Sequence, residues 1–378
     1  MIELSADEAR RFLVRHHALD RPLRAKGARG IRRALASLRM IQLDPLDAIG
    51  TNADLVALAR VDGARRGDVY DALLPGHAFE HFAKERCLLP AEAFAAYRDR
   101  AVQTPWWRLT ERAKRVPASV LDAVRAEVAE RGPATSAELT DHGAVKALDW
   151  SGWKGTGRMT TMALEILWTR CEVVVAGRAA GGVKIYDLPE RALPDHHDAD
   201  APDFHRWALL ERVDAAGLMA TATSPLWGML RDVRSELTRE LIEEGALVEV
   251  AVEGSRRRYL ARPDLRVSRR APDVRLRILG PLDPLLWDRK LVEQAFGFEY
   301  VWEVYKPAAR RRWGWYVCPL LHRGRLVGRI EAAVEDGALV VEKLWPEDDE
   351  TLDRRALDRA LARHADALGV TSRSRRAR

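Results

Sequence analysis

Residues 172–188 read EVVVAGRAAGGVKIYDL, two apolar runs on either side of a glycine-containing turn. Short runs rich in valine and isoleucine around such a turn are typical of a β-hairpin. Three helical patterns precede the hairpin, over 117–131, 135–139 and 157–170. Helix, helix, helix and hairpin is the order of a winged helix, and we therefore predict a winged-helix domain over residues 117–194.

The same order of elements recurs in the next part of the chain. Helical patterns span 204–216, 224–227 and 231–244, and a second hairpin over 246–261 turns at Glu253-Gly254-Ser255. Recurrence of one supersecondary unit signals a tandem array, so a further winged helix is expected over 195–270. Winged helices bind DNA, but they also serve as protein-contact modules, and a protein-binding scaffold therefore stays an alternative.

Residues 194–203, PDHHDADAPD, separate the two repeats. The segment contains His196 and His197, and histidine side chains can bind metal ions. However, adjacent residues on one loop make poor tetrahedral geometry without distant partners. We interpret the segment as a linker and expect no metal site.

The two ends of the chain carry different patterns. The first 116 residues are mostly helical and contain one short extended segment; the helical patterns span 5–17, 30–39, 51–61, 67–74, 78–86 and 90–102. After Pro272, short apolar runs between Gly and Pro predict a small barrel or sandwich, with strands at 274–279, 300–305, 315–321, 326–332 and 339–344. A closing helix is expected over 350–368, ended by Gly369, and a basic, disordered tail over 372–378.

The predicted fold class is therefore α+β, with tandem winged-helix domains and a C-terminal small β-barrel module. The expected division is a first winged-helix or helical domain, two further winged helices, the β-rich module, and the closing helix with its tail, at residues 1–116, 117–194, 195–270, 271–346 and 347–378.

Composition excludes several classes of protein. With 47% hydrophobic and 31% charged residues, the chain of 378 residues is of ordinary globular type. The net charge of +6 is compatible with nucleic-acid binding without requiring it. Three separated cysteines, Cys87, Cys171 and Cys318, fit a reducing cytoplasm. No signal peptide and no membrane span are expected, and we predict a cytoplasmic monomer, associated with the nucleoid through DNA.

A candidate catalytic pair lies in the extended segment Ile41-Gln42-Leu43-Asp44-Pro45. Side chains alternate along a strand, so Gln42 and Asp44 should point the same way. An amide beside a carboxylate can bind a water molecule, orient it and polarise it. The alternative is structural, since Asp before Pro is also a common start of a turn.

Arginine side chains are the candidates for DNA phosphate contacts. Arg32 and Arg33 lie beside the catalytic pair, Arg158 on a predicted helix, and Arg178 at a hairpin tip. A further run comprises Arg310, Arg311 and Arg312. The alternative for each is a solvated surface arginine.

Several motifs, in this order and spacing, resemble the AlkZ/YcaQ-type DNA glycosylases, and the likeness covers nearly the whole chain. The motifs are Ile41–Asp44, Ala78–Phe82 with Leu88–Pro90, Lys154–Glu165, Val174–Arg178, Tyr186–Arg191, Leu282–Arg289, Phe296–Phe298, Tyr305–Pro307, Gly314–Leu321 and Leu326–Arg329. The strongest is Leu282–Arg289, LDPLLWDR. Residues 50–54, GTNAD, differ from the basic, histidine-containing sequence that follows the catalytic motif in many relatives.

The resemblance implies three tandem winged helices around a concave DNA-binding face, a β-barrel module, and hydrolysis of N-glycosidic bonds to alkylated bases. Gln42-Leu43-Asp44 resembles the Gln-apolar-Asp motif of the YcaQ-like branch, which acts on N7-alkylguanine adducts and some interstrand crosslinks. Gln42 and Asp44 would then be catalytic, and the partner would be double-stranded DNA with alkylated bases.

The residues suit this chemistry. An N7-alkylguanine already carries a positive charge and leaves as a neutral base, so the enzyme must supply a placed water and stabilise an oxocarbenium-like sugar. No lysine neighbours the motif in the sequence, which predicts a monofunctional hydrolase without a Schiff-base step. No metal or organic cofactor is expected.

Two other functions stay open from the sequence. A non-catalytic winged-helix DNA-binding protein, such as a transcription regulator, explains the repeats and the charge but not the β-rich module. A self-resistance glycosylase, specialised for one DNA-alkylating natural product, would share the same fold and the same catalytic pair.

Overall fold

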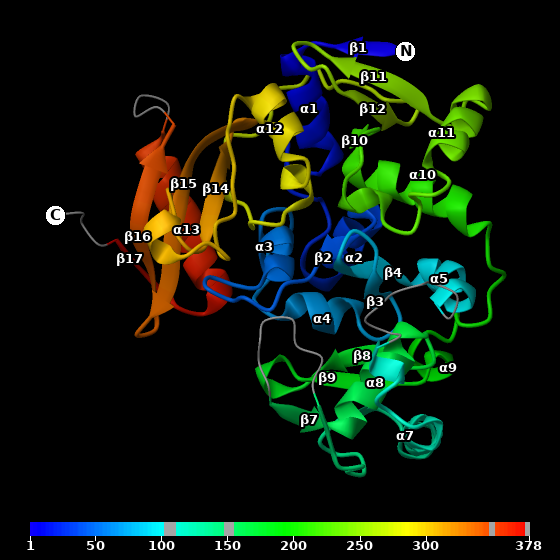
Figure 1. Cartoon of the computed structure of the whole chain (residues 1–378). Helices are drawn as coiled ribbons and strands as arrows, with labels where there is room; N and C mark the ends of the chain where they lie inside the picture. Colours follow the sequence, from blue (N-terminus) through cyan, green and yellow to red (C-terminus); the bar gives the residue numbers. More distant parts are fainter. Residues whose placement is uncertain (102–110, 147–154, 348–351, 375–378) are drawn as a thin grey trace. The chain divides into compact units, whose positions relative to one another are not determined.

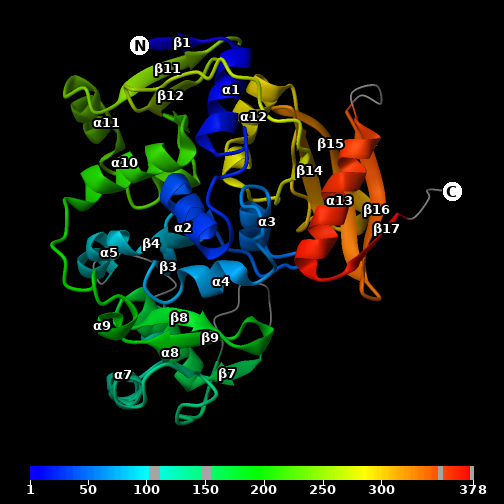
Figure 2. The same ribbon diagram turned by 180° about the vertical axis from the view of Figure 1, so that it is seen from behind.

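The structure, a computed structural model, describes residues 1–101, 111–146, 155–347 and 352–374 (Figures 1 and 2). The chain forms two compact units. Unit 1 comprises residues 1–69, 82–87 and 208–378, and unit 2 comprises residues 70–81 and 88–207. The predicted division into five segments is finer than these units and stays a prediction.

Unit 1 begins with a strand and helices that surround the candidate catalytic segment. They are β1 (Ile2–Leu4), α1 (Ala6–His16), α2 (Gly27–Leu38), β2 (Ile41–Gln42) and α3 (Asn52–Leu58), followed by α4 (Asp68–Leu73) at the edge of the unit. Ser5 caps α1 because its hydroxyl accepts from Glu8 N while the Glu8 carboxylate accepts from Ser5 N. The helix predicted over residues 5–17 is confirmed.

The second repeat contains the predicted hairpin within a larger sheet. Its elements are α10 (Phe204–Ala216), β10 (Met219–Ala220), the 3-10 turn η3 (Pro225–Trp227), α11 (Arg234–Glu243), β11 (Val248–Val252) and β12 (Arg258–Ala261). The sheet has the order β1-β11-β12-β10, and β1 pairs in parallel with β11, Ile2 opposite Val250. The N-terminal strand therefore completes a sheet whose other strands come from residues 219–261.

The β-rich module is one open, curled sheet in the order β13-β14-β15-β16-β17. Its strands are β13 (Arg277–Ile278), β14 (Val317–His322), β15 (Arg325–Glu335), β16 (Ala338–Pro346) and β17 (Thr371–Ser374). Helix α13 (Arg354–Leu368) packs its apolar side against the sheet (Figures 1 and 2), where Leu357 and Leu361 share a core with Leu320 and Ile330. The expected barrel is thus a half-barrel whose face is covered by a helix.

Two sequence predictions in this module are wrong. Residues 300–305 are not a strand but an irregular segment, in which the buried Tyr300 hydroxyl donates to Val317 O at 2.8 Å. The start of the predicted disordered tail forms β17, which pairs in parallel with β16. Gly369 ends α13 in the left-handed conformation with φ 70°, as predicted.

Unit 2 contains the first repeat. Its elements, some of which begin in unit 1, are β3 (Ala78–Phe82), β4 (Arg86–Pro90), the 3-10 turn η1 (Ala91–Ala93), α5 (Phe94–Ala101), α7 (Ala118–Arg131), β5 (Ala134–Thr135), β6 (Ala144–Lys146), β7 (Thr156–Arg158), α8 (Met159–Thr169), β8 (Val174–Arg178), the 3-10 turn η2 (Ala180–Gly182), β9 (Lys184–Asp187) and α9 (Pro189–Ala192). The predicted hairpin is β8–β9, and β5 adds to it in the order β5-β9-β8.

Two helices predicted in this region are wrong. Residues 78–86 form β3, a turn and the start of β4, because the side chains of Ala78–His81 are buried on both faces of the strand. Residues 136–138 form a turn after β5, and Glu138 accepts from both the backbone N–H and the hydroxyl of Thr135. The capping residues are those of a helix start, but the helix does not continue.

The first core of unit 1 is organised around a buried ion pair. Helix α1 packs against α12 (Arg289–Phe296). Beside them, Arg60 donates to both carboxylate oxygens of Asp283, at 2.7 and 2.9 Å, and both side chains are fully buried. Arg60 also donates to the carbonyls of His17 and Val56, so the guanidinium makes four hydrogen bonds to three residues.

Replacing Asp283 tests this pair. Asp283→Asn leaves the buried Arg60 guanidinium without its counter-charge, so we expect the free energy of unfolding to fall by about 3–5 kcal/mol. Urea denaturation measures the change. The control is Glu243→Gln in the exposed pair with Arg239, which should change stability by less than about 1 kcal/mol. Equal effects of the two substitutions would contradict a structural role for the buried pair.

Candidate active site

Gln42 and Asp44 lie at the end of β2, but in different conformations. Gln42 is the last residue of the strand and its side chain is buried. Leu43 N donates to Arg86 O at 2.8 Å, so pairing with β4 continues for one residue. Asp44 lies beyond the strand in a turn, where one carboxylate oxygen, Oδ1, accepts from Leu46 N at 3.0 Å. The strand alternation expected from the sequence therefore holds for Gln42 and ends before Asp44.

The other oxygen of Asp44, Oδ2, has no protein partner among the described residues. The side chain is half-buried, and this burial raises the pKa of the Asp44 carboxyl, while the hydrogen bond from Leu46 N opposes the shift. One oxygen is thus fixed by the backbone. The second is left for a water molecule or a substrate.

Lys84 holds the amide of Gln42. Its ammonium nitrogen donates to Gln42 Oε1 at 2.8 Å and lies 5.4 Å from the centre of the Trp287 ring. Burial lowers the pKa of Lys84. Because Oε1 faces the lysine, the amide N–H groups of Gln42 point away from it.

Lys84 is therefore a neighbour of the motif in three dimensions, although no lysine lies near the motif in the sequence. Lys84 is 42 residues from Gln42 in the sequence. It lies in the turn between β3 and β4, a region predicted to be helical, and the pairing of β4 with β2 brings it to the site. No local sequence signal connects the two residues.

Asn52 fixes the backbone of the site. Its side-chain amide donates to Gln42 O at 2.8 Å, and its Oδ1 accepts from Leu282 N at 3.1 Å. Gly280 must lack a side chain here, because a Cβ would lie 2.6 Å from Asn52 Oδ1. The strongest resemblance motif, Leu282–Arg289, thus supports the candidate catalytic segment rather than forming it.

Residues 50–54 have a structural role. Thr51 and Asp54 form a capping box at the start of α3. Asp54 also accepts from Gly67 N at 2.8 Å. The segment begins a helix and anchors the following loop.

An exposed aromatic residue lies near the carboxylate. Tyr305 is 82% exposed, and its ring packs edge-on against Trp302 with centroids 5.6 Å apart. The pKa of Tyr305 is raised, first by partial burial of the phenol and then by the negative charges of Asp44 and Glu85. Tyr305 was part of a resemblance motif, and the sequence assigned it no role.

The candidate DNA-binding arginines of unit 1 differ in their surroundings. Arg32 and Arg33 are exposed on α2, and Arg310 is exposed in the 3-10 turn η5 (Ala308–Arg310). Arg311 donates to Lys306 O at 2.8 Å, and Arg312 pairs with Glu299 at 2.7 Å.

In unit 2, Arg158 and Arg178 have protein partners. Arg158 donates to Leu139 O at 3.2 Å. Arg178 pairs with the buried carboxylate of Glu80, and its guanidinium lies 4.7 Å from the centre of the Tyr70 ring. These contacts tie both arginines to the unit itself, and phosphate contact by any of the seven arginines stays a prediction.

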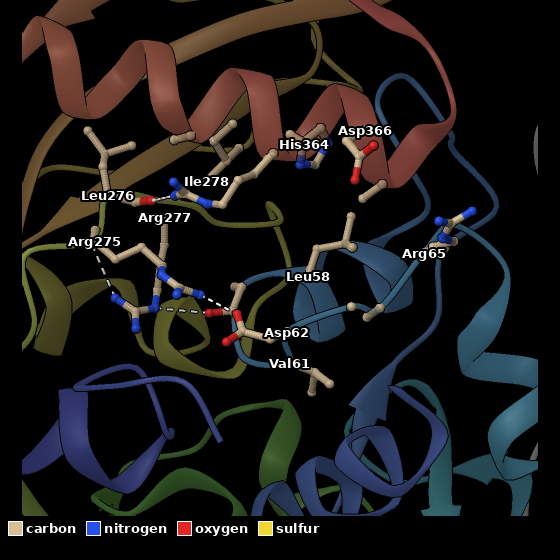
Figure 3. Close-up of a pocket in the computed structure, with 16 residues that line it drawn as sticks. Leu58, Val61, Asp62, Arg65, Arg275, Leu276, Arg277, Ile278, His364 and Asp366 are labelled. Atoms are coloured by element: carbon tan, nitrogen blue, oxygen red, sulfur yellow. Dashed lines mark hydrogen bonds and ion pairs between the residues drawn. The ribbon is translucent and has the colours of Figure 1, made fainter. Parts of the chain in front are cut away.

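Unit 1 also contains a pocket that does not include Gln42 or Asp44. Its volume is about 320 Å³, and several arginines line it (Figure 3). Arg275 pairs with Asp62, and Arg363 donates to Leu276 O at 2.9 Å. Arg277 donates to Ala59 O at 3.0 Å. Arg275, Arg277 and Arg363 are thus held by contacts within the protein, so this pocket is a weaker candidate for the catalytic site than the Gln42 segment.

The described residues contain no group of three or more His, Cys, Asp or Glu side chains placed to hold a metal ion. Within the same part of the chain, no helix has the length and apolar character needed to cross a membrane.

Comparison with known proteins defines the class. A family model described as "DNA glycosylase AlkZ-like" matches residues 35–367, and the chain therefore belongs to the AlkZ-like DNA glycosylase family. The solved structure of the Streptomyces sahachiroi DNA glycosylase AlkZ superposes with a TM-score of 0.61 at 20% sequence identity. The match covers 99% of this chain and 100% of that chain, so the α+β fold is shared throughout. The family expected from the sequence is confirmed.

Replacing Lys84 tests its role as a positioning residue. Lys84→Met removes the donor to Gln42 Oε1, and we expect kcat for base excision to fall about tenfold, equivalent to about 1.4 kcal/mol in the barrier. KM and the unfolding midpoint should change little, because methionine occupies the same partly apolar space. The exposed Lys26→Met is the control. An unchanged kcat in Lys84→Met would show that the lysine does not position the side-chain amide of Gln42 for the reaction.

Proposed function

We propose that the chain hydrolyses the N-glycosidic bond of N7-alkylguanine in double-stranded DNA, with Asp44 and Gln42 as catalytic residues. The observation that carries the proposal is the state of Asp44. One of its oxygens is bound by the backbone of Leu46, and the other has no protein partner in the described part of the chain. A half-buried carboxylate fixed in this way is suited to bind a water molecule beside the sugar.

The chemistry follows from the charges. As the bond to the base breaks, positive charge develops on the sugar, and the Asp44 carboxylate stabilises it. The same carboxylate accepts a proton from the attacking water. The Gln42 N–H groups, turned away from Lys84, position that water or a sugar oxygen. The leaving base needs no proton because N7 alkylation has already made it a good leaving group.

Water rather than lysine is proposed as the nucleophile. The amine of Lys84 is engaged with Gln42 Oε1 and lies against the Trp287 ring, which disfavours attack on the sugar. The enzyme is accordingly proposed to be monofunctional. Trapping of a covalent enzyme–DNA adduct with borohydride would contradict this part of the proposal.

We further propose that the two helix-and-hairpin segments, residues 118–187 and 204–261, serve as winged-helix modules on duplex DNA. Arg32, Arg33 and Arg310 would contact phosphates from exposed positions, and Arg158, Arg178, Arg311 and Arg312 would act with their present partners. Tyr305, exposed near Asp44, would stack on a base. A monomer acting on cytoplasmic DNA fits this arrangement, and an adduct tied to the opposite strand would also reach a catalytic segment at the surface.

The primary test compares release of 7-methylguanine from methylated duplex DNA by wild type and Asp44→Asn. We expect a loss of about 100-fold or more, because the variant lacks the general base and the negative charge. Affinity for DNA should stay nearly unchanged. The exposed Asp232→Asn is the matched control.

Two outcomes of this test contradict the proposal. If wild type binds DNA but releases no base, either from methylated DNA or from a nitrogen-mustard crosslink, the chain is a DNA-binding protein without this activity. If Asp44→Asn loses folding or DNA binding, Asp44 is a structural turn residue.

The pH dependence gives a further prediction. Burial raises the pKa of Asp44, and the reaction needs its ionised form, so protonation stops catalysis at a higher pH than for an exposed aspartate. Excision should therefore fall on acidification with a midpoint above the ordinary aspartate value. A single-turnover pH–rate profile measures it, and a rate that stays constant down to the ordinary aspartate range would exclude Asp44 as the base.

A further inference from the structure

A row of arginines on α13 leads into the pocket of Figure 3. Arg355, Arg359 and Arg363 follow one another at four-residue spacing, so they lie along one side of the helix. The other walls of the pocket come from the end of α3, the loop after it, and the segment that contains β13. We call this space the α13 pocket. Its volume of about 320 Å³ lies within the range of about 300–1,000 Å³ typical of small-molecule sites.

A neighbouring hollow shares two arginines with the α13 pocket. Its volume is about 310 Å³, and Arg275 and Arg363 line both spaces, whereas Arg359 lines only the second. The charge of Arg359 also acts on Arg363. A ligand beside Arg363 at the border of the two hollows is therefore close to the arginines of both.

Positive charge is in excess around the two hollows. The lining contains five arginines and three aspartates, namely Arg65, Arg275, Arg277, Arg359 and Arg363 with Asp62, Asp273 and Asp366. Arg275 pairs with Asp62, and Arg277 donates to both carboxylate oxygens of Asp273. Asp366 balances Arg65 in this count. The charges of Arg359 and Arg363 are left over.

Neither of these two arginines has a carboxylate partner. Within the part of the chain that the structure describes, Arg359 and Arg363 form no ion pair. The pKa of Arg363 is lowered, first by burial and then by the charges of neighbouring arginines, with Arg275 foremost, although Asp62 opposes the shift. Like charges held this close repel one another, and an anion between them would relieve the repulsion.

The guanidinium of Arg363 is held in place but keeps free donors. Its Nη2 donates to Leu276 O at 2.9 Å, which fixes the group without neutralising its charge. An arginine has five N–H donors, so the remaining ones are available to a ligand. The buried side chains of Ile278 and Ala360 add an apolar part to the lining, which an organic group can contact.

We propose that the α13 pocket binds the phosphate group of a small molecule, with Arg359 and Arg363 as its main contacts. A phosphate monoester carries a charge of about −1.5 to −2 at pH 7 and so matches two uncompensated guanidinium groups. A carboxylate would neutralise only one of them. The backbone phosphates of DNA carry one negative charge each and would also leave one arginine uncompensated. The proposal goes beyond the proposed function and does not depend on it.

Isothermal titration of the full chain with inorganic phosphate, at constant ionic strength, tests the proposal. Wild type should bind phosphate saturably, and acetate at the same concentration should not compete. Arg363→Gln and Arg359→Gln should each weaken binding about tenfold, the effect of losing one charge-assisted hydrogen bond. Arg355→Gln is the matched control, because Arg355 lies on the same helix, carries the same charge and lines neither hollow. Its affinity should equal that of wild type.

Thermal unfolding separates a ligand contact from a structural effect. Arg359 makes no hydrogen bond or ion pair to the described residues, so Arg359→Gln should leave the unfolding midpoint unchanged. Phosphate should raise the midpoint of wild type, because a ligand that binds only the native state stabilises it. The rise should be smaller in Arg359→Gln and unchanged in Arg355→Gln.

A parallel titration with adenosine monophosphate identifies the source of the phosphate. Tighter binding than that of inorganic phosphate would show that the apolar lining contacts an organic group, and equal or weaker binding would mark free phosphate as the ligand. Both outcomes support the proposal.

Three outcomes would overturn it. They are the absence of saturable binding by either compound, equal affinity in wild type and both arginine variants, and displacement of phosphate by a DNA duplex without terminal phosphates. The last outcome would make backbone diesters the ligand. None of these measurements uses base excision, so the failure of this proposal and the failure of the proposed function are distinguishable.

Discussion

The ion pair between Arg60 and Asp283 is the contact on which the arrangement of unit 1 depends. It joins the end of α3 to the loop before α12, and Arg60 also binds the carbonyl of His17 after α1. Removing two charges from water is costly, and the four hydrogen bonds of the guanidinium, two of them to the Asp283 carboxylate, offset that cost. Because these bonds are directional, they restrict the relative placement of the segments that they join.

The candidate catalytic segment around Gln42 takes its position from the same loop. Asn52 links Gln42 O to Leu282 N, one residue before Asp283, and Trp287 in the same loop contacts Lys84. Both the backbone and the side chain of Gln42 are thus set by residues far away in the sequence. Asp44, by contrast, is fixed only by its own turn, which leaves one of its oxygens available for chemistry.

Local signals in the sequence predicted local structure well. The helix over residues 5–17, both hairpins and the Gly369 stop were correct because each depends on residues within a few positions of one another. Residues 78–86 and 300–305 were wrong because long-range packing and hydrogen bonds, rather than periodicity, determine their conformation. The same reason explains the candidate site. The Gln42 motif was visible in the sequence, but the positions of Lys84 and Asn52 depend on contacts that no sequence spacing reveals.

The pairing of β1 with β11 has a consequence for how the chain folds as it is synthesised. Ile2 is paired with Val250, so the first strand has no partner until most of the protein has left the ribosome. All of unit 2 lies within residues 70–207, and its own contacts are complete before that point. We therefore expect unit 2 to fold first during translation. Until β11 has been synthesised, the apolar surface of the amino-terminal segment stays exposed, and chaperones would bind it at this stage.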